Sequence, residues 1–151
     1  MEIVEFQPAH AAAFKALNEA WIGKYFTVEP KDREVLEDPV GKIIARGGKI
    51  FMALQDGRAV GCAALIAMAD GGYEVAKRTV SEELRGTGLG KQLMQACIDA
   101  GRALGAPRLY LETNSSLAPA IGLYRAMGFR HLDPVASDYA RADVFMERPL
   151  P

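Results

Sequence analysis

The sequence has few of the residues that build metal centres or disulfides. It contains two cysteines and two histidines among 151 residues. Cys62 and Cys97 each lie in an apolar segment, which predicts buried free thiols in a reducing compartment. His10 and His131 are far apart in the chain, so the sequence predicts no zinc site and no other metal site.

The sequence also lacks a charge excess and a long apolar run. Its 18 basic and 19 acidic residues nearly cancel, so no electrostatic feature favours nucleic acid or an acidic membrane surface as a partner. No apolar run approaches the ~18 residues needed to cross a bilayer. Residues 1–5 lack the basic region and apolar core of a secretion signal. We therefore expect a cytoplasmic protein.

The residues that are present predict one domain spanning residues 1–151, with a mixed α/β (α+β) fold. Half of the residues are hydrophobic, which suits a sizeable core. Apolar periodicity and turn residues predict a single, mostly antiparallel mixed sheet of about six to seven strands flanked by about four helices. The strands are expected at 2–6, 49–54, 58–68, 73–80, 108–112, 129–132 and 141–148. The helices are expected at about 8–23, 29–36, 88–104 and from Ser115 or Ser116 to Gly128.

Two features of this pattern bear on function. Strand 108–112 follows a helix, which predicts that it pairs in parallel. In strand 73–80, regular alternation places the even-numbered residues from Glu74 to Val80 on one face and the odd-numbered residues from Tyr73 to Thr79 on the other.

A glycine-rich stretch, Val80–Lys91, lies between this strand and the helix at 88–104. Gly86, Gly88 and Gly90 alternate with other residues where the helix should begin. The first N–H groups of a helix have no intrahelical partner, and the helix dipole adds positive potential there. The stretch therefore predicts a cradle for phosphate oxygens.

The spacing excludes the two common nucleotide loops. A Walker-type loop would need glycine at Arg85 and a hydroxyl side chain at Gln92. A Rossmann loop needs G-x-G-x-x-G directly after the first strand, whereas this loop reads G-x-G-x-G and follows a three-stranded meander.

The segment Arg85–Gly90 fits the pattern Arg/Gln-x-x-Gly-x-Gly/Ala and resembles the acetyl-coenzyme A loop of the GNAT superfamily of N-acetyltransferases. Downstream, Leu111–Asn114 and Ala120–Phe129 are similar to the family's second motif, N…A…LY…GF. The order of strands and helices is also similar, so the resemblance covers nearly the whole chain and implies the GNAT fold.

The resemblance implies an enzyme that moves an acetyl group from acetyl-CoA to a primary amine of a small molecule or peptide. Transfer would be direct, within a ternary complex, and would use no metal. Dimers are common in the family, so a homodimer is implied by resemblance alone. Two alternatives stay open, namely a non-catalytic acyl-CoA-binding or regulatory domain, and an acyltransferase that prefers a longer acyl group.

The resemblance also assigns cofactor-binding residues. Backbone N–H groups of the loop would wrap the pyrophosphate, and Asn114 would bond the pantetheine arm or a bridging water. As alternatives, the charged side chains of the loop are only solvated, and Asn114 forms a helix cap or a strand-end turn. The expected residues are Val80, Arg85, Gly86, Thr87, Gly88, Leu89, Gly90, Lys91, Asn114 and Tyr124.

Two catalytic residues are expected. In the family the pantetheine arm lies along strand 73–80, and an arm of about 15 Å ends about four or five residues before Val80, at roughly 3.3 Å per residue. Glu74 would then lie near the amine and act as the base, unless it is only paired with a neighbouring cation. Tyr124 matches the family's proton donor to the leaving thiolate, the alternative being plain helix packing.

The acceptor site is expected between the first two helices and the last hairpin. Trp21, Tyr25, Phe26 and Glu29 are candidate substrate-binding residues, together with Tyr139 and Arg141 from the far end of the chain. An aromatic and acidic wall would suit a cationic amine. Trp21 and Tyr25 also continue the apolar stripe of their helix, so core packing is the alternative.

Overall fold

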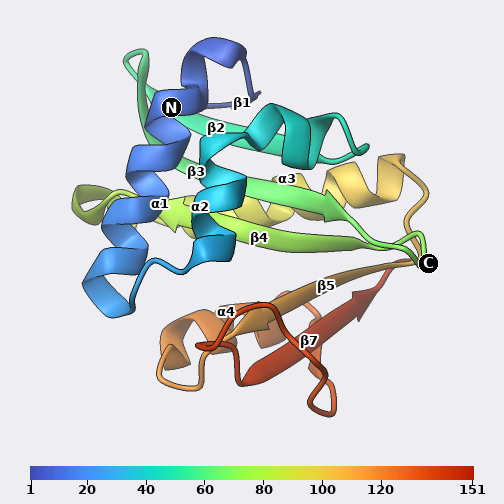
Figure 1. Cartoon of the computed structure of the whole chain (residues 1–151). Coiled ribbons are helices and arrows are strands. Elements are labelled where there is room, and N and C mark those ends of the chain that lie inside the picture. Colours follow the sequence, from blue (N-terminus) through green and yellow to red (C-terminus); the bar gives the residue numbers. More distant parts are fainter.

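The computed structural model describes all residues, 1–151, and is built on one seven-stranded sheet (Figure 1). The strand order is β1-β2-β3-β4-β5-β7-β6, and every neighbouring pair is antiparallel except β4 and β5. The predicted parallel pairing of the fifth strand is thus confirmed. The strands are β1 Glu2–Glu5, β2 Lys49–Gln55, β3 Arg58–Ala67, β4 Tyr73–Val80, β5 Arg108–Thr113, β6 Arg130–His131 and β7 Val144–Pro149.

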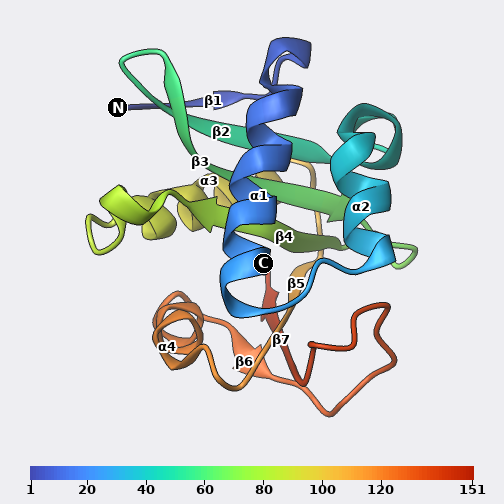
Figure 2. The same cartoon turned by 60° about the vertical axis from the view of Figure 1, so that its left-hand side comes forward.

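Four α-helices cover the two faces of the sheet. Helices α1 and α2 lie on one face and α3 lies on the other, as Figure 2 shows. Helix α4 packs on the same side as α3, since its Tyr124 belongs to the α3 core. The helices are α1 Ala11–Tyr25, α2 Pro30–Glu37, α3 Leu89–Ala103 and α4 Ala118–Ala126, with short 3-10 turns at Pro8–His10 and Glu82–Leu84 and a π-helical turn at Val40–Ile44. None of them is long and apolar enough to span a bilayer.

The predicted fold class is confirmed, and the differences are local. Helix α4 begins at Ala118, later than predicted, because Asn114 Oδ1 accepts a hydrogen bond from Ser116 N at 2.9 Å and holds a turn after β5. The last strand begins at Val144 rather than at Arg141. Helix α2 ends at Glu37, close to the predicted end at residue 36, and the π-helical turn at Val40–Ile44 follows it.

Each face of the sheet has its own hydrophobic core. Phe14, Leu36 and Met52 belong to the core under α1 and α2. Leu93 and Met146 belong to the core under α3 and α4. The two cysteines are buried, one in each core, and burial raises the pKa of each thiol to about 12. The prediction of buried free thiols is confirmed.

The middle of β4 contains a bulge that the sequence pattern did not predict. Cys62 pairs with Thr79 and Ala64 with Ala76, so two β4 residues lie opposite one β3 residue. Lys77 has φ 53°, a left-handed conformation that is uncommon outside glycine. The predicted alternation is therefore wrong beyond this point.

Side-chain packing confirms the change of face. Val75 and Val80 both pack in the α3 core, although their numbers differ in parity. Thr79, which was expected to share a face with Val75, donates instead to Asn18 of α1 at 2.9 Å. The physical reason is the extra residue of the bulge, which reverses the in-out order of everything after it.

The bulge also separates β4 from β5. Only Tyr73 with Leu109 and Glu74 with Tyr110 are paired between them. Figure 1 shows the two strands together at their N-terminal ends and apart toward their C-terminal ends. The backbone of β4 beyond Glu74 consequently has no strand partner on this side.

Candidate active site

A cleft of about 950 Å³ opens where β4 and β5 separate. Its walls come from α1 and α2 on one side and from the N-terminal end of α3 and helix α4 on the other. Most residues nominated from the sequence line it: Trp21, Tyr25, Phe26, Glu74, Val80, Arg85, Gly86, Gly88, Gly90, Lys91, Asn114, Tyr124, Tyr139 and Arg141.

Three nominated residues lie outside the cleft lining. Leu89 is buried in the α3 core. Thr87 is exposed and its hydroxyl donates to the Leu84 carbonyl within the loop. Glu29 lies at the start of α2, where its carboxylate accepts hydrogen bonds from Ala140 N at 2.9 Å and from Arg141 at 3.3 Å.

The glycine loop presents a row of free backbone donors at the head of α3. Gly86 and Gly88 have φ values of 77° and 87°, which side-chain-bearing residues rarely adopt. The N–H groups of Gly86, Gly88, Leu89, Gly90 and Lys91 have no hydrogen-bond acceptor within the chain, whereas Gln92 N–H begins the helical bonding to Gly88 O. The unpaired N–H groups predicted at the head of this helix are thus present, in the arrangement that an anion cradle needs.

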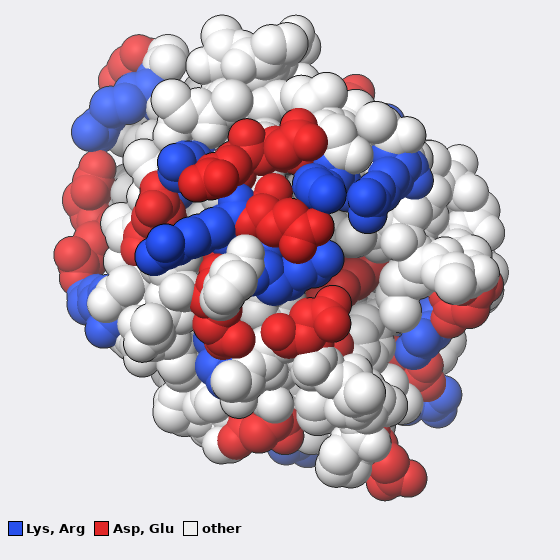
Figure 3. Space-filling view, viewed as in Figure 1, with Lys and Arg blue, Asp and Glu red and all other residues white.

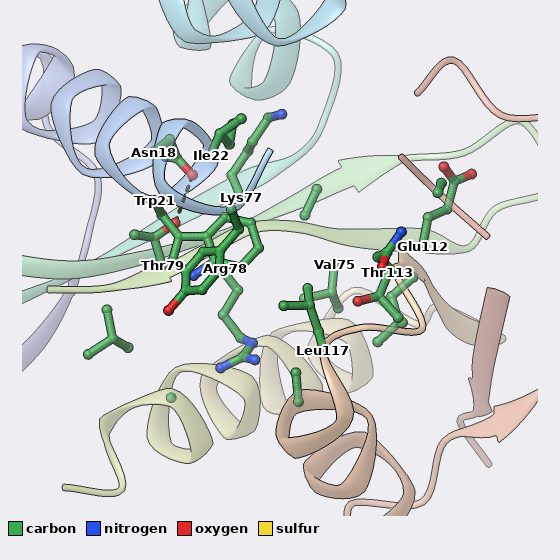
Figure 4. A pocket seen from close by; sticks show the side chains of 18 of the residues that line it. Asn18, Trp21, Ile22, Val75, Lys77, Arg78, Thr79, Glu112, Thr113 and Leu117 are labelled. Carbon is green, nitrogen blue, oxygen red and sulfur yellow. Dashed lines mark hydrogen bonds between the residues drawn. The ribbon is translucent and has the colours of Figure 1, made fainter. Parts of the chain in front are cut away.

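Gly90 is required for a different reason. A Cβ atom there would lie 2.5 Å from the Arg78 guanidinium, so a side chain at position 90 would displace Arg78 from the cleft. The sequence pattern did not single out Arg78 as a site residue. Its position follows from the bulge, which reverses the regular alternation and places Arg78 on the α3 side of β4 and Lys77 on the α2 side (Figure 4).

Arg78 and Tyr124 meet across the cleft. The guanidinium donates to Tyr124 Oη at 3.0 Å and lies 5.1 Å from the centroid of the ring. The Tyr124 ring packs in the α3 core and the residue also lines the cleft, so its packing does not bury it away from the cleft. Since Arg78 occupies an acceptor position of the hydroxyl oxygen, the Tyr124 proton is left to point elsewhere.

Glu74 is partly buried at the inner end of the cleft, where a second cavity of about 170 Å³ adjoins it. Burial raises the pKa of Glu74 to about 7, and the negative charge of Glu112 adds to this effect. The alternative partners expected from the sequence are engaged elsewhere, because Lys77 donates to Asp32 and Arg78 donates to Tyr124. Glu74 is thus a carboxylate poised to exchange a proton near neutral pH.

A buried ion cluster lies beside the cleft and was not predicted. Asp32 is 0% exposed and accepts hydrogen bonds from Lys77 at 2.7 Å and from both terminal nitrogens of Arg141 at 2.7 and 2.8 Å. Burial alone would raise the Asp32 pKa, but the hydrogen bonds from Arg141 and Lys77 hold it well below its usual range. The Tyr139 ring lies 4.8 Å from Lys77 Nζ and 4.6 Å from the Arg141 guanidinium.

The ion cluster connects three distant parts of the chain. It fastens the loop between β6 and β7, through Arg141, to α2 and to the bulge of β4. Removing one partner of such a buried pair typically costs about 3–5 kcal/mol. The only sequence signal for it was the spacing of Glu29 and Asp32 at a helix start, where Asp32 also accepts from Glu29 N–H at 2.9 Å.

The aromatic residues at the end of α1 form the outer wall of the cleft. The rings of Trp21 and Tyr25 are 5.3 Å apart between centroids, and those of Trp21 and Phe26 are 6.1 Å apart. Trp21 also packs against the α1 core, which confirms the packing alternative for this residue, while it lines the cleft as well. Tyr25 accepts a hydrogen bond from Arg85, which links this wall to the glycine loop.

Asn114 lies at the cleft but has both polar ends engaged. Its Nδ2 donates to Arg141 O at 2.7 Å and its Oδ1 accepts from Ser116 N. It therefore forms the strand-end turn that was one of its two expected roles.

No group of three or more His, Cys, Asp or Glu side chains in the chain is arranged to hold a metal ion.

Comparisons with known proteins agree with this geometry. The family model described as the acetyltransferase (GNAT) family matches residues 11–129. An "IAA acetyltransferase" of Azospirillum brasilense is 36% identical over 105 residues, which is 68% of each chain. A GNAT-family acetyltransferase structure from Staphylococcus aureus Mu50 has a TM-score of 0.91 at 19% identity, covering 99% of both chains. A Salmonella typhimurium acetyltransferase structure with its cofactor acetyl-CoA has a TM-score of 0.81 at 22% identity, covering 100% of this chain and 94% of the other.

Proposed function

Because the chain belongs to the GNAT family of acetyltransferases and is therefore an acyltransferase, we propose that it transfers an acetyl group from acetyl-CoA to a primary amine of a small molecule or peptide. Transfer is direct, within a ternary complex formed in the cleft between β4 and β5. Residues 1–151 act as one acyl-CoA-binding domain. The observation that carries this proposal is the row of unpaired N–H groups at the head of α3, in the same cleft as a carboxylate and a hydroxyl of suitable chemistry.

The cleft fits the cofactor at both ends. The free N–H groups from Gly86 to Lys91 would hold the pyrophosphate, with Arg85 and Lys91 as nearby cations. The unpaired β4 backbone beyond Glu74 would bond the extended pantetheine arm as a strand does. That an acetyltransferase of the same fold was solved with acetyl-CoA supports this assignment.

Glu74 is proposed as the base. An alkylammonium has a pKa near that of lysine, about 10.4, and must lose a proton before it can attack a thioester. A carboxylate with a pKa of about 7 is largely ionised at slightly alkaline pH and is still basic enough to accept that proton, directly or through a water.

Tyr124 is proposed as the proton donor to the leaving thiolate. Replacing Tyr124 with phenylalanine should lower kcat about tenfold and leave the KM for acetyl-CoA within about twofold. The effect is modest because a thiolate of pKa near 8.5 leaves readily even without an acid. Steady-state thiol release measures both constants.

The matched control for this change is Tyr73→Phe. Tyr73 lies on β4 outside the cleft lining, so loss of its hydroxyl should leave kcat unchanged. A Tyr124→Phe enzyme with the kcat of the parent would remove the acid role.

The proposed function itself is tested by binding and turnover together. Calorimetry with acetyl-CoA should show binding, and acetyl-CoA with a panel of amines, amino acids and peptides should release thiol and give an acetylated product by mass spectrometry. Binding without release for every acceptor would favour the regulatory-domain alternative. Faster release with propionyl- or butyryl-CoA would favour the longer-acyl alternative.

A further inference from the structure

The inner part of the cleft carries opposite charges on its two sides. Basic side chains come from α2 and the turn that follows it, and acidic side chains come from β4, β5 and the β6–β7 loop. Figure 3 shows both signs crowded at the centre of the face that carries α2. We call the first group the basic side, formed by Lys31, Lys42 and Arg46, and the second group the acidic side, formed by Glu74, Glu112 and Asp138; all six residues line the cleft.

The basic side has more positive charge than its own neighbours neutralise. Glu34 is the acidic partner of both Lys42, at 3.1 Å, and Lys31, at 3.8 Å. Arg46 is exposed and forms no ion pair. The two lysines therefore share one carboxylate, and Arg46 has no ion-pair partner. The Lys31 and Lys42 side chains keep 37% and 29% of their surface exposed, so a ligand can reach them.

The acidic side is likewise not neutralised. Glu112 accepts hydrogen bonds from the hydroxyls of Tyr110 and Ser137, which are uncharged donors and leave its charge in place. Glu74 and Asp138 form no ion pair, and the charges of Glu112 and Asp138 both raise the pKa of Glu74. An ammonium group would be stabilised here before it gives up its proton.

The region between the two sides is electrically balanced. Lys77 and Arg141 are neutralised by Asp32 and Glu29, with which they form the buried ion cluster. The two sides face the same cleft, which all six of their side chains line.

We propose that the acceptor is a zwitterionic small molecule, a free amino acid. Its ammonium group lies on the acidic side next to Glu74, and its carboxylate lies on the basic side against Lys31, Lys42 and Arg46. This inference rests on the proposed function and narrows it, because a peptide N-terminus or a simple alkylamine has no carboxylate at that place and leaves the basic side without a partner.

Matched acceptors test the inference. Leucine, methionine and phenylalanine are each compared with their C-terminal amides and with the amines that lack the carboxyl group, and kcat/KM is measured by thiol release. For at least one side chain, the free amino acid should exceed both its amide and its amine by about tenfold or more, which is the gain expected for one well-placed charged contact.

Charge-reversal variants locate the effect. Lys31→Glu and Arg46→Glu should each bring the ratio of kcat/KM for the amino acid to kcat/KM for its amide toward one. Both variants should leave the KM for acetyl-CoA unchanged. Arg102→Glu is the control, since Arg102 is an exposed cation on α3 outside the cleft, and its ratio should match that of the parent.

The outcomes separate the two proposals. The zwitterion inference is overturned if amides or simple amines have kcat/KM values equal to those of the amino acids. It is also overturned if charge reversal leaves the ratio of kcat/KM for amino acid and amide unchanged. The proposed function stands in both cases. If acetyl-CoA binds and no acceptor of any class releases thiol, the proposed function fails and this inference fails with it.

Discussion

Replacing Gly88 with valine is expected to lower the affinity for acetyl-CoA by at least about 100-fold. Gly88 has φ 87° and starts α3, so a β-branched residue there would pull the backbone toward negative φ and turn the neighbouring N–H groups away from the cleft. Each charge-assisted hydrogen bond to the pyrophosphate contributes about 1.5–3 kcal/mol, and each 1.4 kcal/mol is about tenfold in affinity. Loss of two such bonds accounts for the expected change.

The measurement is titration calorimetry, with Gly105→Val as the matched control. Gly105 follows the other end of α3, has φ 72°, and, like Gly88, has no atom within 4 Å of the position that a Cβ would take. The two substitutions impose a similar backbone strain, so the midpoint temperature of thermal unfolding should fall by a similar amount in both variants. Only Gly88→Val should lose cofactor binding. Equal affinities in the two variants would refute the role of the loop.

Replacing Glu74 with glutamine should lower kcat about 100-fold near pH 7. Glutamine keeps the shape of the side chain but cannot accept a proton, and a positioned general base contributes about 10² to 10⁴ in rate. The parent enzyme needs the ionised carboxylate, so its rate should rise with pH through an inflection at about 7 and then level off. The variant should lose this inflection. Unchanged rate and profile would show that another group, or water alone, takes the proton.

Two comparisons make the Glu74 result specific. Glu112→Gln removes a negative charge that raises the Glu74 pKa, so the inflection should move to lower pH while the activity persists.

The pH dependence of stability gives the second comparison. Because the folded-state pKa of Glu74 lies above its ordinary value of 4.5, the parent loses stability as pH rises from there through about 7. Glu74→Gln lacks that loss and should unfold at an equal or higher temperature above pH 7.

The glycine loop shows how much of the site could be predicted from the sequence. Its conformation depends on neighbours in the chain, because positive φ at Gly86 and Gly88 and the unpaired N–H groups of α3 are properties of a few consecutive residues. The same holds for the Asp56-Gly57 hairpin, for the αL end of α4 at Gly128, and for most helix and strand positions.

The neighbours of Glu74 show what could not be predicted. Pairing with a neighbouring cation, Lys77 or Arg78, was the alternative to a role of Glu74 as the base. The bulge in β4 exchanges their faces, so that Lys77 points toward α2 and Arg78 toward the α3 side. Each has a partner far away in sequence, Asp32 at 45 residues and Tyr124 at 46. Because Lys77 is held by Asp32 and Arg78 lies on the other face, Glu74 forms no ion pair, and burial is the largest cause of its raised pKa.

The sequence by itself therefore determined the order of elements, the conformation of the glycine loop and the family. These depend on periodicity, on glycine conformation and on spacing within short segments. Only the tertiary structure decided which face of the sheet each β4 residue takes after the bulge. It also decided the Arg78–Tyr124 contact and the buried cluster in which Asp32 binds Arg141, 109 residues away in the chain. The physical reason is that hydrogen-bond partners, burial and electrostatic environment depend on which distant segments meet, and no local pattern records that meeting.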